Sequence, residues 1–325
     1  MKEERRMKTI RGALLLGLGW LFAGLCSAQY PDKPITIVVP YPAGGVMDLT
    51  ARAIADSLTG MVSQPVVVVN KTGAGATIGG NAVATATPDG YTLGFFPVAA
   101  AVPEVFRFAY SAPYSSSDLR AVSAVAATAM SFAVKADSPI RSMKDVIELA
   151  RKSSGLMIGT PGKQTLPSMI MVKMAAKEGV KLEDAPFGGD AKTLPALLGG
   201  HVQVGAIDFA ALKSSVEAGK IRVLAVCTEK RIDLAPDVPT VLELGYDLPY
   251  VSSLGLFGPK ALPDDVTRRL DELMARISRE AKFVNRMKEM SIQIAYKDAA
   301  TYRQALARDR DNLEAFFTQQ GMYKK

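Results

Sequence analysis

Short runs of β-branched residues alternate with helix-forming stretches along the chain, and this alternation constrains the fold more than any other feature. The N-terminal part contains the apolar runs 35–39, 65–69 and 91–96, with helical spacing over 49–58 and 78–86 between them. A β-α-β-α-β order favours a parallel sheet with helices on its faces. The runs are apolar throughout, as expected for strands that are covered on both faces of the sheet.

The same order of elements returns downstream. We expect helices at 143–152, 166–179, 191–198 and 210–218, and strands at 122–134, 156–159, 201–207 and 221–228. A Pro-rich stretch, 235–239, then precedes a strand at 254–259 and two long amphipathic helices, 264–279 and 299–319.

This pattern predicts an α/β fold with two Rossmann-like lobes, in keeping with the usual division of chains of about 300 residues. We expect lobe 1 to comprise 29–126 together with 229–325, and lobe 2 to comprise 127–228, with hinge strands near 127 and 229. In such an arrangement a ligand binds in the cleft between the lobes, where the carboxyl ends of strands face each other.

The first 28 residues have the pattern of a secretory signal peptide. A basic start precedes the apolar run 13–25, which is too short to span a bilayer, and Ser27-Ala28 ends a stretch of small residues suited to cleavage. We expect cleavage after Ala28. Acylation of Cys26 as a lipoprotein is the alternative, and translation starts at Met1 or at Met7.

Few residues remain for metal or nucleophilic chemistry after cleavage. The length falls from 325 to 297 residues and the formal charge from +7 to +4, because five basic and two acidic residues are removed. One histidine, His201, and one cysteine, Cys227, remain, so disulfides, structural zinc sites and Cys-ligated clusters are excluded. The modest charge does not indicate nucleic-acid binding. We expect no cofactor, no metal and no catalytic group.

Glycine-rich turns after the strands carry the polar groups instead. In the turn 40–48, Gly44 and Gly45 precede a helix whose free N–H groups can bind an anion without a cation, and Asp48 could cap that helix or bind a ligand donor. The turn 70–80 contains G-x-G-x-x-x-G, which differs from a dinucleotide fingerprint in spacing and in position.

Two turns of the second half are also candidates. The turn 159–168 offers neutral donors at a helix start but lacks the spacing of a phosphate loop. In the turn 186–190, Asp190 alone is most simply a helix N-cap. Asp208 closes the strand 201–207 on the cleft side, whereas His201 lies at the remote end of that strand.

At this point the chain resembles a known family. Residues 39–48 read VPYPAGGVMD and precede Ala51-Arg52, similar to the V-P-F-x-P-G-G-x-x-D-x-x-A-R signature of tripartite tricarboxylate transporter substrate-binding proteins, the Bug family. The similarity continues in order at 64–70, 73–75, 78–79, 88–93, 197–200, 218–220, 224–226 and 238–241. The resemblance implies a periplasmic binding protein of type II that closes on a small carboxylate, held mainly by backbone amides and waters, and delivers it to a two-component membrane permease.

The turns and the resemblance together give the candidate ligand contacts. They are Tyr41, Ala43, Gly44, Gly45, Met47, Asp48, Phe96, Pro97, Thr160, Gly162, Gln164, Thr165, Phe187, Gly188, Gly189, Asp190 and Asp208.

The chain departs from the family pattern at several of these turns. Val46-Met47 replaces a frequent Ser-Thr, Ser168 stands where a histidine is frequent, and Phe187-Gly188-Gly189 replaces Tyr-Lys-Gly. Because hydroxyls and a cation are lost, we expect a monocarboxylate with an apolar or aromatic body. We expect a monomer with permease subunits as partners and no nucleic acid. The alternatives are a receptor for a membrane kinase and a periplasmic enzyme using Asp48 or Asp190.

Overall fold

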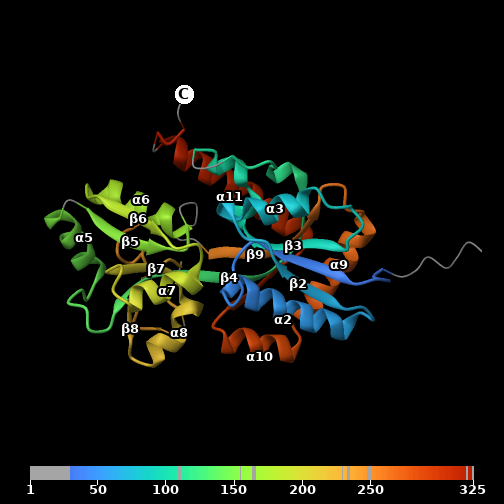
Figure 1. Ribbon diagram of the computed structural model, residues 1–325, viewed down its shortest axis with the longest axis horizontal. Helices are drawn as coiled ribbons and strands as arrows, with labels where there is room; N and C mark the ends of the chain where they lie inside the picture. The colour runs from blue at the N-terminus through green and yellow to red at the C-terminus, as the bar shows by residue number, and fades with distance from the viewer. Residues whose placement is uncertain are drawn as a thin grey trace, which may run out of the picture.

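The computed structural model describes residues 30–108, 111–153, 155–162, 166–228, 230–232, 235–246, 251–319 and 321–323. The expected signal peptide lies outside these residues. The described chain forms two α/β lobes that lie side by side in Figure 1, with β1 to β3 on the right and β5 to β8 on the left. The predicted α/β fold with two lobes is confirmed.

Lobe 1 is built on parallel strands that pair in the order β2-β1-β3. The strands are β1 (Ile35–Val39), β2 (Val66–Asn70) and β3 (Thr92–Pro97), and the crossover helices are α2 (Val46–Met61) and α3 (Thr77–Ala84). The β-branched strands pair in parallel because each helix returns the chain to the same edge, so all three strands end on one side of the lobe.

Lobe 2 repeats this arrangement with β5 parallel to both β6 and β7. Its strands are β5 (Leu156–Thr160), β6 (Leu182–Pro186), β7 (Val204–Asp208) and β8 (Ile221–Val226), and its helices are α5 (Met143–Lys152), α6 (Leu166–Glu178), α7 (Asp190–Leu198) and α8 (Phe209–Glu217). Strand β7 begins at Val204, three residues later than expected, because His201 lies in an exposed turn before it.

One long strand, β4, connects the lobes. The 17-residue β4 (Leu119–Lys135) pairs with β9 (Val251–Pro259) and β10 (Gln293–Lys297) through its earlier part, and with β7 and β8 through its later part. The main sheet path therefore runs β2-β1-β3-β9-β4-β7-β5-β6. The lobes share one continuous strand, which joins them at the centre of Figure 1.

The C-terminal helices cover lobe 1. They are α9 (Asp264–Ile277), α10 (Ala281–Glu289) and α11 (Ala299–Gln319), and the short α4 (Val98–Ala101) follows β3. The sequence analysis missed α10, β10, α4 and, in lobe 2, β6. Phe316 and Phe317, near the end of α11, join the apolar cluster that contains Phe132 of β4. None of the helices in the described part of the chain is long and apolar enough to cross a bilayer.

Candidate ligand-binding cleft

A cavity of about 500 Å³ lies where strand-to-helix turns of the two lobes face each other. Lobe 1 contributes the turns after β1 and β2 together with α4, and lobe 2 contributes the turns after β5 and β6. The lining residues are Pro40, Tyr41, Pro42, Thr72, Gly73, Ala74, Gly75, Ala76, Ala99, Pro161, Gly162, Pro186, Phe187 and Gly188. This is the place where doubly wound sheets bind ligands.

Asp48 holds the first two turns together. Its buried carboxylate accepts hydrogen bonds from the Gly44 N–H, from Asn70 Nδ2 and from Arg52 Nε, each at 2.9 Å, and Arg52 Nη2 completes a two-pronged ion pair. Burial raises the pKa of the Asp48 carboxyl, but the hydrogen bonds from Arg52, Gly44 and Asn70 outweigh burial and hold the pKa below its ordinary value. Donors of the chain itself occupy both oxygens, so Asp48 positions the turn.

The start of α2 presents backbone donors toward the cleft. Gly45 is the N-cap and makes no side-chain capping bond, and the first intrahelical hydrogen bond runs from the Leu49 N–H to the Gly45 carbonyl at 2.9 Å. The N–H groups of the first turn of a helix have no intrahelical acceptor and carry the positive end of the helix dipole. The side chains of Val46 and Met47 are buried in the core, so this segment offers an anion its backbone only.

The turn after β2 supplies five lining residues that the sequence analysis did not select. Gly73, Ala74, Gly75 and Ala76 have φ of 125°, 46°, 64° and 78°, respectively. Such conformations are costly for alanine, and they cluster at sites where a backbone must take a special shape. The signal was present, because the sequence places two glycines directly after a parallel strand next to β1. The sequence analysis includes 73–75 in the family similarity and rejects a dinucleotide fingerprint there, but it selects no ligand contact from this turn.

A buried network of hydrogen bonds within lobe 2 holds the turn after β5 in place. The Thr160 side chain is fully buried, and its hydroxyl and that of Ser168 both donate to the Asp184 carboxylate. The Thr160 carbonyl accepts from the Phe187 N–H at 2.9 Å, which ties the turns after β5 and β6 together. The Thr160 hydroxyl is therefore bound inside lobe 2 and is not the free donor that we expected. Gln164 and Thr165 lie outside the described residues.

Asp190 is the first residue of α7, but it does not cap that helix. Gly189 is the N-cap, with no side-chain capping bond, and Asp190 Oδ1 accepts from the Asp208 N–H at 3.2 Å. Asp208 itself caps α8 by accepting from the Ala210 N–H at 3.0 Å. The interpretation of Asp190 as an N-cap is therefore wrong, whereas Asp208 has a capping role that we had not assigned.

The two lobes approach each other at this point. Burial raises the pKa of Asp190 to about 6, and the hydrogen bond from Asp208 offsets part of that rise. Burial also raises the pKa of Tyr41, and the charge of Asp190 adds to the effect across the cleft. A Cβ atom added at Gly189 would lie 3.3 Å from the Pro42 side chain. Tyr41 and Pro42 of lobe 1 therefore face the start of α7 in lobe 2.

Phe96 and Pro97, two of the candidate contacts, do not line the described cavity. Phe96 is fully buried and stacks on Phe257 with ring centroids 4.5 Å apart, so its side chain belongs to the lobe 1 core and not to the cleft. Pro97 is the N-cap of α4, and Ala99 of that helix lines the cavity instead. Side chains alternate between the two faces of a strand, and that of Phe96 points to the face that packs on Phe257. A position at the end of a strand therefore does not by itself place a side chain in the cleft.

The cavity lining contains no lysine or arginine among the described residues. Within those residues, no group of three or more His, Cys, Asp or Glu side chains is placed to hold a metal ion. The described lining therefore offers a ligand backbone N–H groups, the hydroxyl-bearing side chains of Tyr41 and Thr72, and apolar side chains.

Comparison with known proteins identifies the family to which this chain belongs. Residues 50–321 match the model of the tripartite tricarboxylate transporter family receptor. The chain belongs to this family. A UPF0065 protein in the gbd 5′ region of Cupriavidus necator is 32% identical over 313 residues, which cover 95% of this chain and 94% of that protein.

Solved structures of periplasmic binding proteins share the fold. The binding protein BugD superposes with a TM-score of 0.81 at 26% identity, covering 91% of this chain and 100% of BugD. The structure of R. palustris Rpa4515 with adipate has a TM-score of 0.84 at 25% identity, covering 90% and 98% of the two chains. The resemblance to the Bug family is thus confirmed.

Four of the residues selected from the sequence of this receptor line the described cavity: Tyr41, Gly162, Phe187 and Gly188. Ala43, Gly44 and Gly45 lie next to it in the turn after β1, where Ala43 and Gly44 are exposed. Which of these residues touch a ligand stays a prediction.

Proposed function

We propose that this receptor binds a small organic carboxylate between its lobes in the periplasm and delivers it to a tripartite tricarboxylate-type membrane permease. The observation that carries the proposal is the cavity of about 500 Å³ lined by turns of both lobes, beside the uncapped start of α2. Backbone donors at such a helix start bind carboxylates without a cation. The related Rpa4515, whose structure contains adipate, supports the ligand class.

We propose a ligand with one carboxylate and an apolar or aromatic body. Tyr41, Phe187 and the prolines of the turns give the cavity an apolar lining, and the described lining has no lysine or arginine to neutralise a second carboxylate. Asp190, close to Tyr41, adds negative charge beside the cavity. A dicarboxylate or tricarboxylate would place further charge against this surface at a cost that a monocarboxylate avoids.

Closure of the lobes is the proposed mechanism. We propose that lobe 1 (29–126 and 229–325) and lobe 2 (127–228) rotate about the middle of β4 and the segments that link β8 to β9. The pairing of β4 with β9 before this point and with β7 and β8 after it supports a hinge there. A ligand bound between the turns favours the closed state, because only that state offers it contacts from both lobes.

We propose a receptor without enzymatic activity, acting as a monomer after signal-peptide removal. The proteins that it resembles are substrate-binding proteins. The occupied carboxylate of Asp48 argues against its use as a catalytic base, because Gly44, Asn70 and Arg52 already bind it.

A thermal-shift screen with the mature protein tests this function. The panel contains benzoate, phenylacetate, adipate and citrate, and each stabilising compound is then titrated by calorimetry and recovered to check for conversion. We expect an aromatic monocarboxylate to stabilise the protein by about 2.7 kcal/mol at roughly a hundredfold excess over Kd, without conversion. Stabilisation by citrate alone would contradict the ligand class, and chemical conversion of a bound compound would contradict the receptor function.

Thr72→Glu provides the matched cleft variant for that screen. Thr72 is exposed and lines the cavity, so a carboxylate at this position should repel an anion without disturbing the core. Thr59→Glu on the far part of α2 adds the same charge outside the cavity and should leave binding unchanged. Equal binding by both variants would show that the ligand lies elsewhere.

A further inference from the structure

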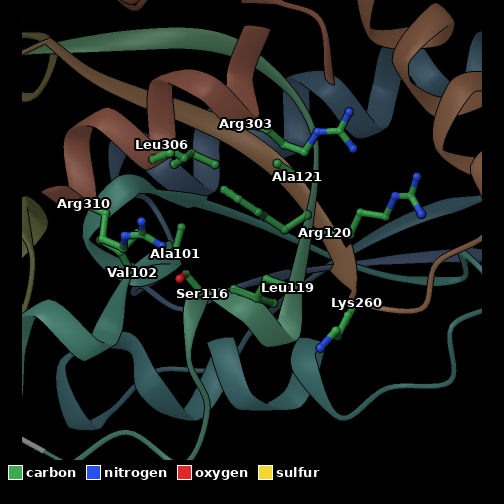
Figure 2. Close-up of a pocket in the computed structure, with 12 residues that line it drawn as sticks. Ala101, Val102, Ser116, Leu119, Arg120, Ala121, Lys260, Arg303, Leu306 and Arg310 are labelled. Atoms are coloured by element: carbon green, nitrogen blue, oxygen red, sulfur yellow. The ribbon is translucent and has the colours of Figure 1, made fainter. Parts of the chain in front are cut away.

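A second cavity of about 380 Å³ lies in lobe 1 and shares no lining residue with the cleft. Helix α4 separates the two, because Ala99 lines the cleft whereas Ala101 lines the second cavity. Its lining residues, of which Figure 2 shows the arrangement, are Ala101, Val102, Ser116, Leu119, Arg120, Ala121, Phe257, Lys260, Arg303, Leu306, Ala307 and Arg310. We call it the α11 pocket.

The floor of the α11 pocket is apolar. Phe257 of β9, Ala121 of β4 and Val102 after α4 are buried lobe residues that form part of its lining. Leu306 of α11, which packs against the lobe 1 core, and the exposed Ala307 add apolar surface to the lining. A ligand with an apolar body can cover this surface.

The rim of the α11 pocket is cationic. Arg303 and Arg310 lie two turns apart on α11, on the same helix face as Leu306, while Arg120 comes from β4 and Lys260 follows β9. Figure 2 shows these side chains around the hollow, with α11 on one side and the strands on the other. Three elements distant in sequence bring these cations together, so the charge is not the solvated face of a single helix.

Two of these cations make no direct contact with a carboxylate in the described part of the chain. Neither Lys260 nor Arg303 has a side-chain hydrogen bond or ion pair to any residue in the described ranges. Arg120 Nη1 donates to the Leu262 carbonyl at 2.7 Å and Nη2 pairs with the exposed Asp264. Its Nε is buried and meets no acceptor within the described part of the chain.

The carboxylates around the rim are held by other partners. Asp118 accepts from the N–H and the hydroxyl of Ser115, and Glu104 accepts from those of Ser116. Arg310 is paired with Asp311 of its own helix. Asp118 attracts Lys260 and Asp298 attracts Arg303 through space, but neither carboxylate contacts these cations directly within the described ranges. Both cations can therefore still pair with an incoming acidic group.

We propose that the α11 pocket is a second binding site, for a small organic anion with an apolar body. Its acidic group lies among Lys260, Arg303 and Arg120, and its apolar body rests on Phe257 and Leu306. A neutral apolar compound would cover the apolar floor but would give the cations no anionic partner. An inorganic anion would pair with the cations but would leave the apolar floor exposed to water. The volume lies within the range of small-molecule pockets, which favours a free solute over a segment of another protein.

Fluorescence titration of the mature protein tests the proposal with anilinonaphthalene sulfonate, an aromatic anion that brightens in apolar surroundings. The neutral comparator is N-phenylnaphthylamine, which has the same rings without the sulfonate. The variant is Lys260→Gln with Arg303→Gln, both exposed, so the fold should survive. The matched control is Arg141→Gln with Lys144→Gln, two exposed cations of lobe 2. Melting temperatures check that all variants fold.

We expect the sulfonate to bind the parent and the control with equal affinity, and the pocket variant at least about tenfold more weakly. Hydrogen–deuterium exchange should show protection by the sulfonate at 98–121, 254–262 and 299–310. Equal affinity for the neutral comparator, or no loss in the pocket variant, would overturn the proposal. Loss in Thr72→Glu instead would place the probe in the cleft, which overturns the second site and leaves the proposed receptor function standing.

Discussion

At the scale of single residues, Asp48 shows that a residue of the family motif can hold two turns together instead of contacting a ligand. Its carboxylate joins the turn after β1 to the end of β2 through Gly44, Arg52 and Asn70. We predict that Asp48→Asn lowers the free energy of unfolding by about 2 kcal/mol, because charge-assisted hydrogen bonds are lost at a buried position. Urea denaturation measures this change.

Asp56→Asn is the control for that measurement. Asp56 lies on the same helix, is exposed, and within the described part of the chain pairs only with the exposed Lys282. Its loss should cost at most a few tenths of a kcal/mol. If Asp48→Asn and Asp56→Asn had the same free energy of unfolding, Asp48 would not hold the two turns together. A loss of ligand affinity in Asp48→Asn is also expected, since Gly44 loses its anchor.

Asp190 gives the cleft a dependence on pH. Burial raises its pKa to about 6, so the charge that repels a bound carboxylate disappears as the pH falls through that value. We predict that calorimetry finds severalfold tighter carboxylate binding near pH 5 than near pH 8. Asp190→Asn keeps the acceptor for the Asp208 N–H and should remove the dependence, whereas the exposed Asp237→Asn should retain it. A flat profile in the parent protein would contradict this role.

The raised pKa of Asp190 also makes the stability of the folded protein depend on pH. The folded Asp190 carboxyl has a pKa above the unfolded value of about 3.9, so the folded state binds more protons between these values. The contribution of Asp190 to stability therefore falls as the pH rises from about 4 to about 6. Above that window the folded state carries the charge of the half-buried carboxylate.

At the scale of elements, α3 packs tightly against the ends of β1 and β2 through Gly79. A Cβ atom there would lie 2.7 Å from the Pro40 side chain and 2.8 Å from the Lys71 carbonyl oxygen. We predict that Gly79→Ala lowers the melting temperature and weakens ligand binding, because Pro40 lines the cleft and must move. Differential scanning calorimetry and ligand titration measure the two effects.

Gly60→Ala is the matched control in a second helix. An added Cβ at Gly60 in α2 meets nothing within 4 Å. It should leave binding unchanged and raise stability by roughly 0.5–1 kcal/mol through helix propensity. A similar loss in both variants would mean that the effect at Gly79 is not steric.

The alternation of strands and helices was enough to predict most elements, since β-branched runs and helical spacing carry that information locally. The orientation of Phe96 was not predictable, because burial against Phe257 depends on a strand far away in sequence. The partners of Asp48 include Asn70, 22 residues away, so the family motif alone could not separate a ligand contact from a clamp. The turn after β2 yielded no predicted contact because its glycine spacing matches no dinucleotide fingerprint, and the positive φ of Ala74 and Ala76 is not evident from the sequence.

At the scale of the whole molecule, β4 and the segments that link β8 to β9 are the proposed axis for motion of the lobes. We predict that a saturating carboxylate ligand reduces the radius of gyration measured by small-angle X-ray scattering, because closure expels solvent from the cleft. Thr72→Glu at the same ligand concentration should not contract. The compactness of the free protein serves as the baseline for both.

The outcome separates two ways in which this receptor could recognise its ligand. Contraction together with exchange protection in the turns after β1, β2, β5 and β6 would mean that both lobes contribute binding energy, as the shared lining of the cavity implies. Binding without contraction would mean that one lobe suffices and that Tyr41 and Asp190 already meet in the free state. The hinge proposal requires contraction. A ligand that binds the closed state more tightly than the open state must raise the population of the closed state, and the closed state is the more compact one.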